Sequence, residues 1–150
     1  MGKYNFKADL KIAQKTELRV AELMEQEYNC EILEFNDDNK YDLLLTDEYG
    51  EPHTIEIKED FMCKYTGNVS LEYESRGKLS GISISKADEY IYVIHTENDI
   101  EYWYFDTKDL REMVDQQKYF RIVNGGDKGS NTMNYLFKYN VFVEWGHKLN

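Results

Sequence analysis

The spacing of apolar residues changes along the chain from a helical period to strand-like alternation. From Asp9 to about Tyr28 apolar residues recur at helical spacing with no glycine or proline among them, which predicts one amphipathic helix with Asp9 as its N-cap. Beyond this helix, short apolar or alternating runs bounded by turn residues predict β-strands. These runs are 30–35, 43–45, 53–58, 68–74, 90–95, 100–105 and 119–123.

Further helical signals are found in the second half of the chain. A helix is predicted from Thr107 to Gln117, with Thr107 as its N-cap and Asp109 near the positive end of its dipole. We also expect a short helical turn from Lys86 to Asp88. The tail from Tyr135 to Trp145 is apolar and fits a strand as well as a helix.

The segment from Tyr41 to Lys58 reads as a β-hairpin that carries three informative charges. Because side chains alternate across a strand, Glu56 and Lys58 point to the same side, opposite to the isoleucines beside them. In the preceding strand Leu44 shares a face with Asp42, and leucines on both faces indicate a strand that is covered on both sides. We therefore expect Asp42 near a buried edge and not in open solvent.

Two acids and a lysine in this arrangement suit Mg²⁺-dependent hydrolysis of a phosphodiester. Mg²⁺ prefers oxygen ligands at about 2.0–2.1 Å and is usually held by one or two carboxylates plus substrate phosphate, which Asp42 and Glu56 would provide. Lys58 would orient or deprotonate the attacking water and stabilise the charge of the transition state. The alternative is structural: Glu56 and Lys58 form an ion pair on the wet side of an antiparallel sheet, and Asp42 is a turn residue.

This hairpin resembles the PD-(D/E)XK nuclease superfamily, in which an acid, a (D/E)XK triplet and a core βββ meander form the active site. The motif stands here as Asp42 followed by Glu56-Ile57-Lys58, and Tyr41 replaces the proline that often precedes the first acid. In the preceding helix, TELRVAELM is similar to the first helix of the Holliday junction resolvase branch, and Glu17 is the matching acid. Glu22 competes for this position, and a solvated helix face would explain both glutamates.

The resemblance implies a restriction-endonuclease-like α/β fold: a central mixed β-sheet, with a βββ meander after the N-terminal helix, flanked by helices. It implies a Mg²⁺-dependent DNA endonuclease, closest to Holliday junction resolvase-like and phage-type members, in which Mn²⁺ can replace Mg²⁺. Small nucleases of this kind usually act as homodimers, and branched DNA is the first substrate to test. The catalytic residues expected from the resemblance are Asp42, Glu56, Lys58 and Glu17.

The strand from Asn68 to Glu74 adds a further candidate ligand. In resolvase-like and phage-type nucleases a stretch of this appearance lies beside the metal, so the resemblance implies that Glu72 joins Asp42, Glu56 and Glu17 as a metal ligand or contacts those ligands. An exposed strand face is the alternative. The loop from Ser75 to Gly81 is basic and hydroxyl-bearing, which suits phosphate contacts and also a solvated turn. The expected DNA-binding residues are Lys64, Asn68, Arg76, Lys78, Ser80, Lys86 and Lys128.

The net charge of −11 is unusual for a protein that binds nucleic acid. The charge is uneven, since residues 1–60 hold 7 Lys or Arg against 16 Asp or Glu, whereas residues 106–150 hold 7 against 6. A DNA-binding face can therefore be built from the later parts of the chain. The acidic surface also favours a second hypothesis, a non-catalytic nucleic-acid- or protein-binding module on the same fold. RNA is a further possible substrate.

Composition sets the remaining limits. A chain of 150 residues that is rich in aromatic residues and has one proline is expected to form a single ordered domain over 1–150. Cys30 and Cys63 have no CxxC partner and are expected as free thiols, and the histidines show no zinc-binding spacing. No apolar run reaches the length of a membrane span and no signal peptide is recognised, so we expect no membrane partner and a cytoplasmic location.

Overall fold

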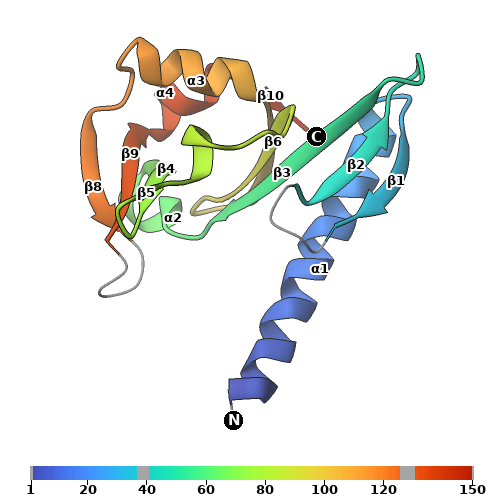
Figure 1. The fold of residues 1–150 in the computed structure, drawn as a ribbon, viewed down its shortest axis with the longest axis horizontal. Helices are drawn as coiled ribbons and strands as arrows, with labels where there is room; N and C mark the ends of the chain where they lie inside the picture. Colours follow the sequence, from blue (N-terminus) through green and yellow to red (C-terminus); the bar gives the residue numbers. More distant parts are fainter. Residues whose placement is uncertain (1, 37–40, 126–130, 150) are drawn as a thin grey trace.

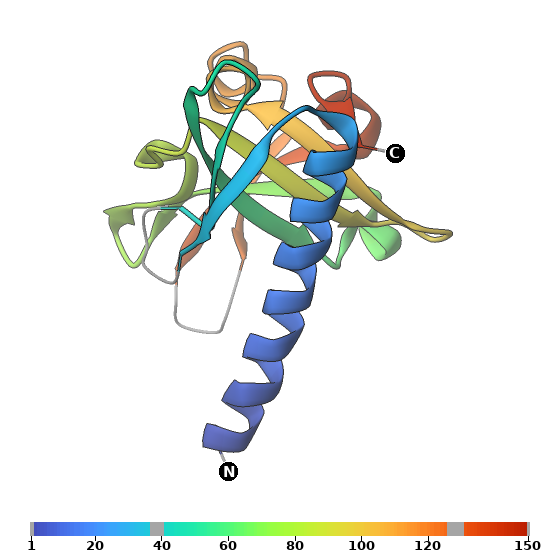
Figure 2. The same ribbon diagram turned by 90° about the vertical axis from the view of Figure 1, so that its right-hand side faces the viewer.

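A computed structural model describes residues 2–36, 41–125 and 131–149 of the chain. The predicted N-terminal helix is confirmed as α1 (Gly2–Glu27), but it begins seven positions before Asp9, which therefore lies inside the helix and is not its N-cap. Residues 2–8 contain no proline to stop the helix, so it continues toward the amino terminus. The C-terminal half of α1 packs on a β-sheet, and its N-terminal half extends beyond the sheet (Figures 1 and 2).

The described residues form a mixed sheet of six strands and an antiparallel sheet of four. Across the first sheet the strand order is β1 (Glu31–Phe35), β2 (Leu43–Thr46), β3 (Pro52–Asp60), β6 (Glu89–His95), β7 (Ile100–Asp106) and β10 (His147–Lys148). Across the second it is β5 (Lys78–Leu79), β4 (Asn68–Ser75), β9 (Thr132–Lys138) and β8 (Arg121–Gly125). The fold class is therefore α/β, as predicted.

The expected βββ meander after the N-terminal helix is confirmed. Antiparallel pairing joins β1 to β2 and β2 to β3, whereas β3 and β6 run parallel. The predicted hairpin between β6 and β7 is also present. The parallel β3–β6 pair makes the sheet mixed, and the chain between these two strands leaves the first sheet to build α2 (Cys63–Thr66), β4, β5 and the 3₁₀ turn η1 (Gly81–Ser83).

One prediction about local structure is wrong in the connection that leads to β6. The expected helical turn at Lys86–Asp88 is absent, and the one turn of helix in this connection lies at η1. Asp88 instead joins the start of β6 to β3, because its carboxylate accepts hydrogen bonds from the backbone N–H and the hydroxyl of Thr54 at 2.9 and 3.1 Å. The ambiguous tail contains both elements, since β9 ends at Lys138 and α4 (Tyr139–Val143) follows directly.

The N-cap of the second predicted helix is also shifted by one residue. This helix is α3 (Thr107–Asp115), and its N-cap is Asp106, whose carboxylate accepts from the backbone N–H of Lys108 at 3.2 Å. An aspartate is at least as good an N-cap as a threonine, so the earlier residue takes the position.

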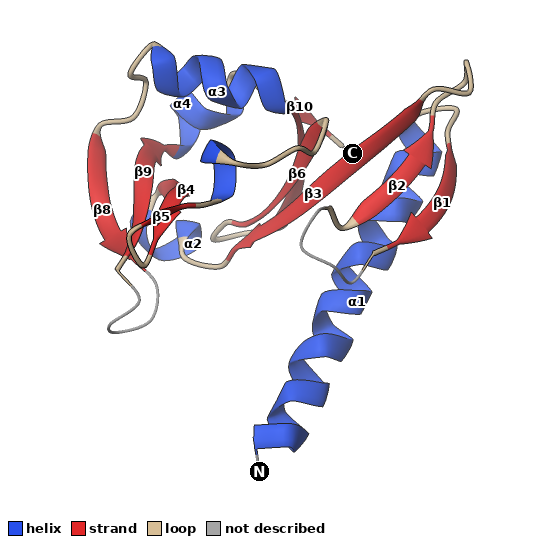
Figure 3. Cartoon of the chain, in the orientation of Figure 1, coloured by secondary structure: helices blue, strands red, loops and turns tan. Residues whose placement is uncertain are grey.

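The core has two clusters, one on each face of the six-stranded sheet. One cluster packs the sheet against α1, through Val20, Leu23 and Met24 of the helix. The other packs the opposite face against the second sheet and against α3 and α4, and a group of aromatic rings fills its centre: Tyr92, Phe105, Phe137 and Phe142. Helices therefore flank the sheet as expected, but the second sheet shares one of its faces with them (Figure 3).

Two smaller expectations concern cysteines and membranes. Cys30 and Cys63 are both free thiols, as predicted. Within the part of the chain that the structure describes, none of the helices combines the length and the apolar character that crossing a bilayer requires.

Candidate metal centre

The register of the β2–β3 hairpin brings Asp42 and Glu56 to the same place. Leu43 pairs with Ile55, so the next position of this antiparallel register sets Asp42 opposite Glu56. Side chains at opposite positions of a ladder share a face. Leu43 and Ile55 belong to the cluster under α1, and Asp42 and Glu56 therefore lie on the face that is turned away from that helix. We refer to Asp42 and Glu56 as the carboxylate pair.

Lys58 completes the expected motif on the same face. Its Nζ lies 3.4 Å from Oε1 of Glu56, and the side chain of the lysine is 41% exposed, compared with 22% for the glutamate. Burial alone would lower the pKa of Lys58, but the charge of Glu56, with contributions from Tyr90 and Glu72, raises it instead. The lysine is therefore a cation at neutral pH.

Burial and mutual repulsion disfavour the charges of the carboxylate pair. Burial raises the pKa of Asp42, although the backbone N–H of Ile57 and the charge of Lys58 oppose this effect. Burial also raises the pKa of Glu56, and the charge of Asp42 adds to the shift. A divalent cation between two such carboxylates would stabilise both ionised forms.

The donor set fits Mg²⁺ better than a transition metal. Oδ2 of Asp42 accepts a hydrogen bond from the backbone N–H of Ile57 at 2.7 Å, which holds this carboxylate in place. Among the described residues no group of three or more His, Cys, Asp or Glu side chains could hold a metal ion. Two carboxylates with water and phosphate satisfy Mg²⁺, whereas a zinc site usually needs three or four protein ligands.

The structure does not bring Glu17 to the carboxylate pair. Glu17 belongs to α1, which covers the opposite face of the sheet, and its neighbour Thr16 donates to Oε1 of Glu59 at 3.1 Å. Glu59 alternates with Glu56 along β3, so this contact lies on the far face. The competing Glu22 forms an exposed ion pair with Arg19 at 3.2 Å. The packing of α1 on the apolar face therefore separates the helix acids from the proposed ligands.

Glu72 lies near Lys58 but does not complete a group of three ligands. It belongs to β4 of the second sheet and lines a cavity of about 400 Å³ together with Lys58, Tyr90 and Asn134. Its charge contributes to the raised pKa of Lys58. The first sheet thus provides Asp42, Glu56 and Lys58. The second sheet provides Glu72, which lines the cavity beside Lys58.

Asp60 is a residue of this face that the motif does not include. It is 9% exposed, and its Oδ1 accepts from the backbone N–H groups of Met62 and Cys63 at 2.9 and 3.0 Å. Its Oδ2 accepts from the backbone N–H of Ser70 at 3.3 Å. Asp60 therefore ties the end of β3 to α2 and β4. The alternation that groups Glu56 with Lys58 also includes Asp60, which is the signal that sequence reasoning missed.

The predicted DNA-binding residues lie in two separate places. Arg76 and Lys78 are exposed at the β4–β5 turn, and Lys86 is exposed in the connection that leads to β6. Lys64 is exposed on α2, which precedes the first residue of β4. The two ends of β4 are about 25 Å apart at 3.3 Å per residue, so Lys64 is far from the β4–β5 turn. Asn68 begins β4, Ser80 follows β5 with its hydroxyl buried, and Lys128 lies outside the described residues. The structure therefore does not gather these residues into one patch.

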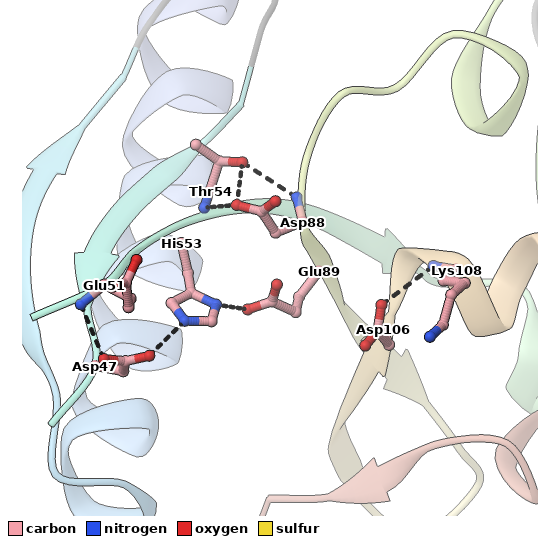
Figure 4. Close-up of polar contacts among 8 residues, drawn as sticks. All are labelled: Asp47, Glu51, His53, Thr54, Asp88, Glu89, Asp106 and Lys108. Carbon is pink, nitrogen blue, oxygen red and sulfur yellow. Dashed lines mark hydrogen bonds and ion pairs between the residues drawn. The ribbon is translucent and has the colours of Figure 1, made fainter. Parts of the chain in front are cut away.

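A polar clamp holds the hairpin of the carboxylate pair against β6 (Figure 4). Nδ1 of His53 lies 2.7 Å from Oε1 of Glu89 on β6, and Nε2 lies 2.8 Å from Oδ2 of Asp47 in the hairpin turn. Burial alone would lower the pKa of His53, but the hydrogen bonds and charges of the two carboxylates raise it. The imidazole ring therefore links two carboxylates that are far apart in the sequence.

The carboxylate pair and Lys58 thus occupy one face of an α/β sheet, and Glu72 approaches them from a second sheet. Comparison of the chain with family models, with curated protein sequences and with solved structures finds no match.

Proposed function

We propose that the protein is a Mg²⁺-dependent DNA endonuclease of restriction-endonuclease-like fold. The observation that carries this proposal is the position of Asp42 opposite Glu56 on one face of a buried hairpin, with Nζ of Lys58 at 3.4 Å from the glutamate. The order of α1, the βββ meander and a parallel strand after the (D/E)XK strand supports the fold assignment. A homodimer in the cytoplasm that acts on branched DNA is part of the same proposal.

The chemistry assigned to each residue follows from its surroundings. When bound, a divalent cation supplies Lewis acidity and an activated water molecule. Asp42, held by the N–H of Ile57, and Glu56 on the paired strand would hold the cation. Lys58 acts as a cation that stabilises negative charge developing on the phosphate, and not as a base, because its pKa is raised.

A metal-dependence assay tests the proposal. Purified protein is incubated with linear duplex, single-stranded and four-way-junction DNA in Mg²⁺, Mn²⁺ or EDTA, and products are separated on gels. We expect cleavage with either metal, none in EDTA, and a loss of about 100-fold or more for Lys58→Ala, because the cation that stabilises the charge on the phosphate is removed. Lys148→Ala is a matched control, because Lys148 is 44% exposed, compared with 41% for Lys58, and its Nζ lies 3.6 Å from Oε2 of a glutamate, Glu101.

Two results would contradict the nuclease proposal. One is that wild-type protein leaves all three substrates intact in both metals, and the other is that Lys58→Ala cleaves as fast as Lys148→Ala. The alternative of a non-catalytic binding module is favoured by the net charge of −11. That module would retain DNA or protein binding that Lys58→Ala leaves unchanged.

A further inference from the structure

The cavity beside Lys58 lies between the two sheets. It encloses about 400 Å³, within the range of small-molecule sites, and β3, β4, β6 and η1 all contribute to its walls. Tyr92, Leu71 and Ile82 provide buried apolar wall, and Phe61 and Met62 are more than half exposed and also line the cavity. The site therefore offers a mostly apolar enclosure with an aromatic component.

Some of the polar groups in the cavity already have partners. The hydroxyl of Tyr92 donates to the backbone carbonyl of Ser70 at 3.1 Å. Both oxygens of Asp60 accept backbone N–H groups. These groups hold the walls together, and a ligand would not use them.

Tyr90, Asn134 and Glu72 offer polar groups to a ligand. Tyr90 is 1% exposed, and burial raises the pKa of its hydroxyl, although a hydrogen bond with Ser85 opposes this shift. The amide of Asn134 makes one long contact, at 3.5 Å, with the carbonyl of Thr132. Glu72 is half-buried and lines the same space. These hydroxyl, amide and carboxylate groups are the ones with which a ligand in the cavity would form hydrogen bonds.

The charge of the cavity selects among ligands. Among the lining residues that the structure describes, Lys58 is the one cation, whereas Asp60 and Glu72 are acids. Glu59 also lines the cavity, but its carboxylate lies on the far face of the sheet, where it accepts from Thr16. The resulting negative field disfavours a phosphate deep in the cavity and favours a neutral group. A planar heterocycle would bury its faces against the apolar walls and hydrogen-bond through its edge.

We propose that this cavity receives one unpaired nucleobase of the DNA substrate, a cytosine or an adenine, with its exocyclic amino group toward Glu72 or Asn134. Carboxylates accept from the amino group of cytosine, and the amide of asparagine pairs with adenine. This proposal rests on the proposed nuclease function, because Lys58 borders both the cavity and the carboxylate pair. A base stacked inside a duplex cannot enter such a cavity, so the base next to the scissile phosphate must be unpaired in the substrate or be extruded from the duplex.

Binding of short fluorescent single strands in EDTA tests the proposal without hydrolysis. The probes are an oligocytidine strand, a strand of the same length in which every nucleotide lacks its base, and an oligothymidine strand, with anisotropy as the readout. Insertion of a base is worth about 5- to 150-fold in affinity, so we expect the oligocytidine strand to bind at least 5-fold more tightly than the abasic and oligothymidine strands.

Two variants test whether the preference for the oligocytidine strand arises in this cavity. Tyr90→Phe removes only the hydroxyl and should reduce this preference, whereas Tyr49→Phe, at a tyrosine that is 82% exposed and does not line this cavity, should retain it. Equal affinity of wild-type protein for the oligocytidine and abasic strands would overturn the proposal even if Tyr90→Phe did not fold. Metal-dependent cleavage together with equal affinities would leave the nuclease intact and remove only the base site. Base-dependent binding without cleavage would remove the nuclease.

Discussion

Asp60 connects the first sheet to the second, and replacing its carboxylate should therefore lower the free energy of unfolding by a large and predictable amount. The carboxylate accepts three backbone N–H groups, from Met62, Cys63 and Ser70, at 2.9, 3.0 and 3.3 Å. Asp60→Ala leaves all three donors without their acceptor. Cys63 is buried, so its N–H cannot turn to water, whereas Met62 is exposed and Ser70 is half-buried.

The magnitude follows from these differences in burial. A hydrogen bond to a charged acceptor contributes about 1.5–3 kcal/mol, and a buried donor left unpaired costs about 1–3 kcal/mol. Water can accept hydrogen bonds from the N–H groups of Met62 and Ser70 once the carboxylate is gone, which offsets part of the loss. We therefore expect Asp60→Ala to lower the free energy of unfolding by about 3–5 kcal/mol. Asp60→Asn keeps a carbonyl oxygen for Met62 and Cys63 but presents an amide N–H to Ser70, so we expect a loss of about 1–2 kcal/mol.

Urea unfolding measured by circular dichroism and by tryptophan fluorescence tests both values. Asp99→Ala is the control, because Asp99 accepts a backbone N–H from Ile100 at 2.8 Å in an exposed turn, where water can replace it. The reasoning is refuted if Asp60→Ala costs no more than Asp99→Ala. A loss for Asp60→Asn as large as that for Asp60→Ala would show that the retained acceptor contributes nothing.

Two further predictions concern the clamp and the cavity. His53 has a raised pKa, so the stability that its protonated ring provides should be fully present below about pH 6.5 and lost as the pH rises through the folded-state value. His53→Gln should therefore destabilise the protein more at pH 6 than at pH 9 in urea titrations, and an equal loss at both pH values would contradict this assignment. Gly81 has a φ of +51°, and a Cβ there would lie 2.1 Å from the carbonyl oxygen of Glu72. Gly77 is the control, because its φ is +76° and a Cβ there would meet nothing within 4 Å. Gly81→Ala should therefore lower the free energy of unfolding by about 1–3 kcal/mol more than Gly77→Ala does. Equal losses for the two alanine variants, measured by urea unfolding, would show that β4 moves away at little cost.

Local pattern in the sequence was sufficient for α1, α3 and the longer strands, and for the hairpin of the candidate site. The two-residue period of a strand sets Glu56 and Lys58 on one face whatever lies around them. The turn residues between the two strands predict the hairpin, and its register then sets Asp42 opposite Glu56. Helical spacing likewise predicted α1, although not where it begins, because no residue near Asp9 interrupts the helix.

Long-range pairing decided the rest, because a periodic pattern specifies which side of an element is apolar but not which surface it meets. Packing of α1 on the far face separated Glu17 from the carboxylate pair, although the order of elements agreed with the resemblance. Parallel pairing of β3 with β6 brought Tyr90 beside Glu56, 34 positions away in the chain, and the second sheet brought Glu72 toward Lys58. The sequence by itself therefore determined the charged hairpin, and only the tertiary structure determined the cavity beside it.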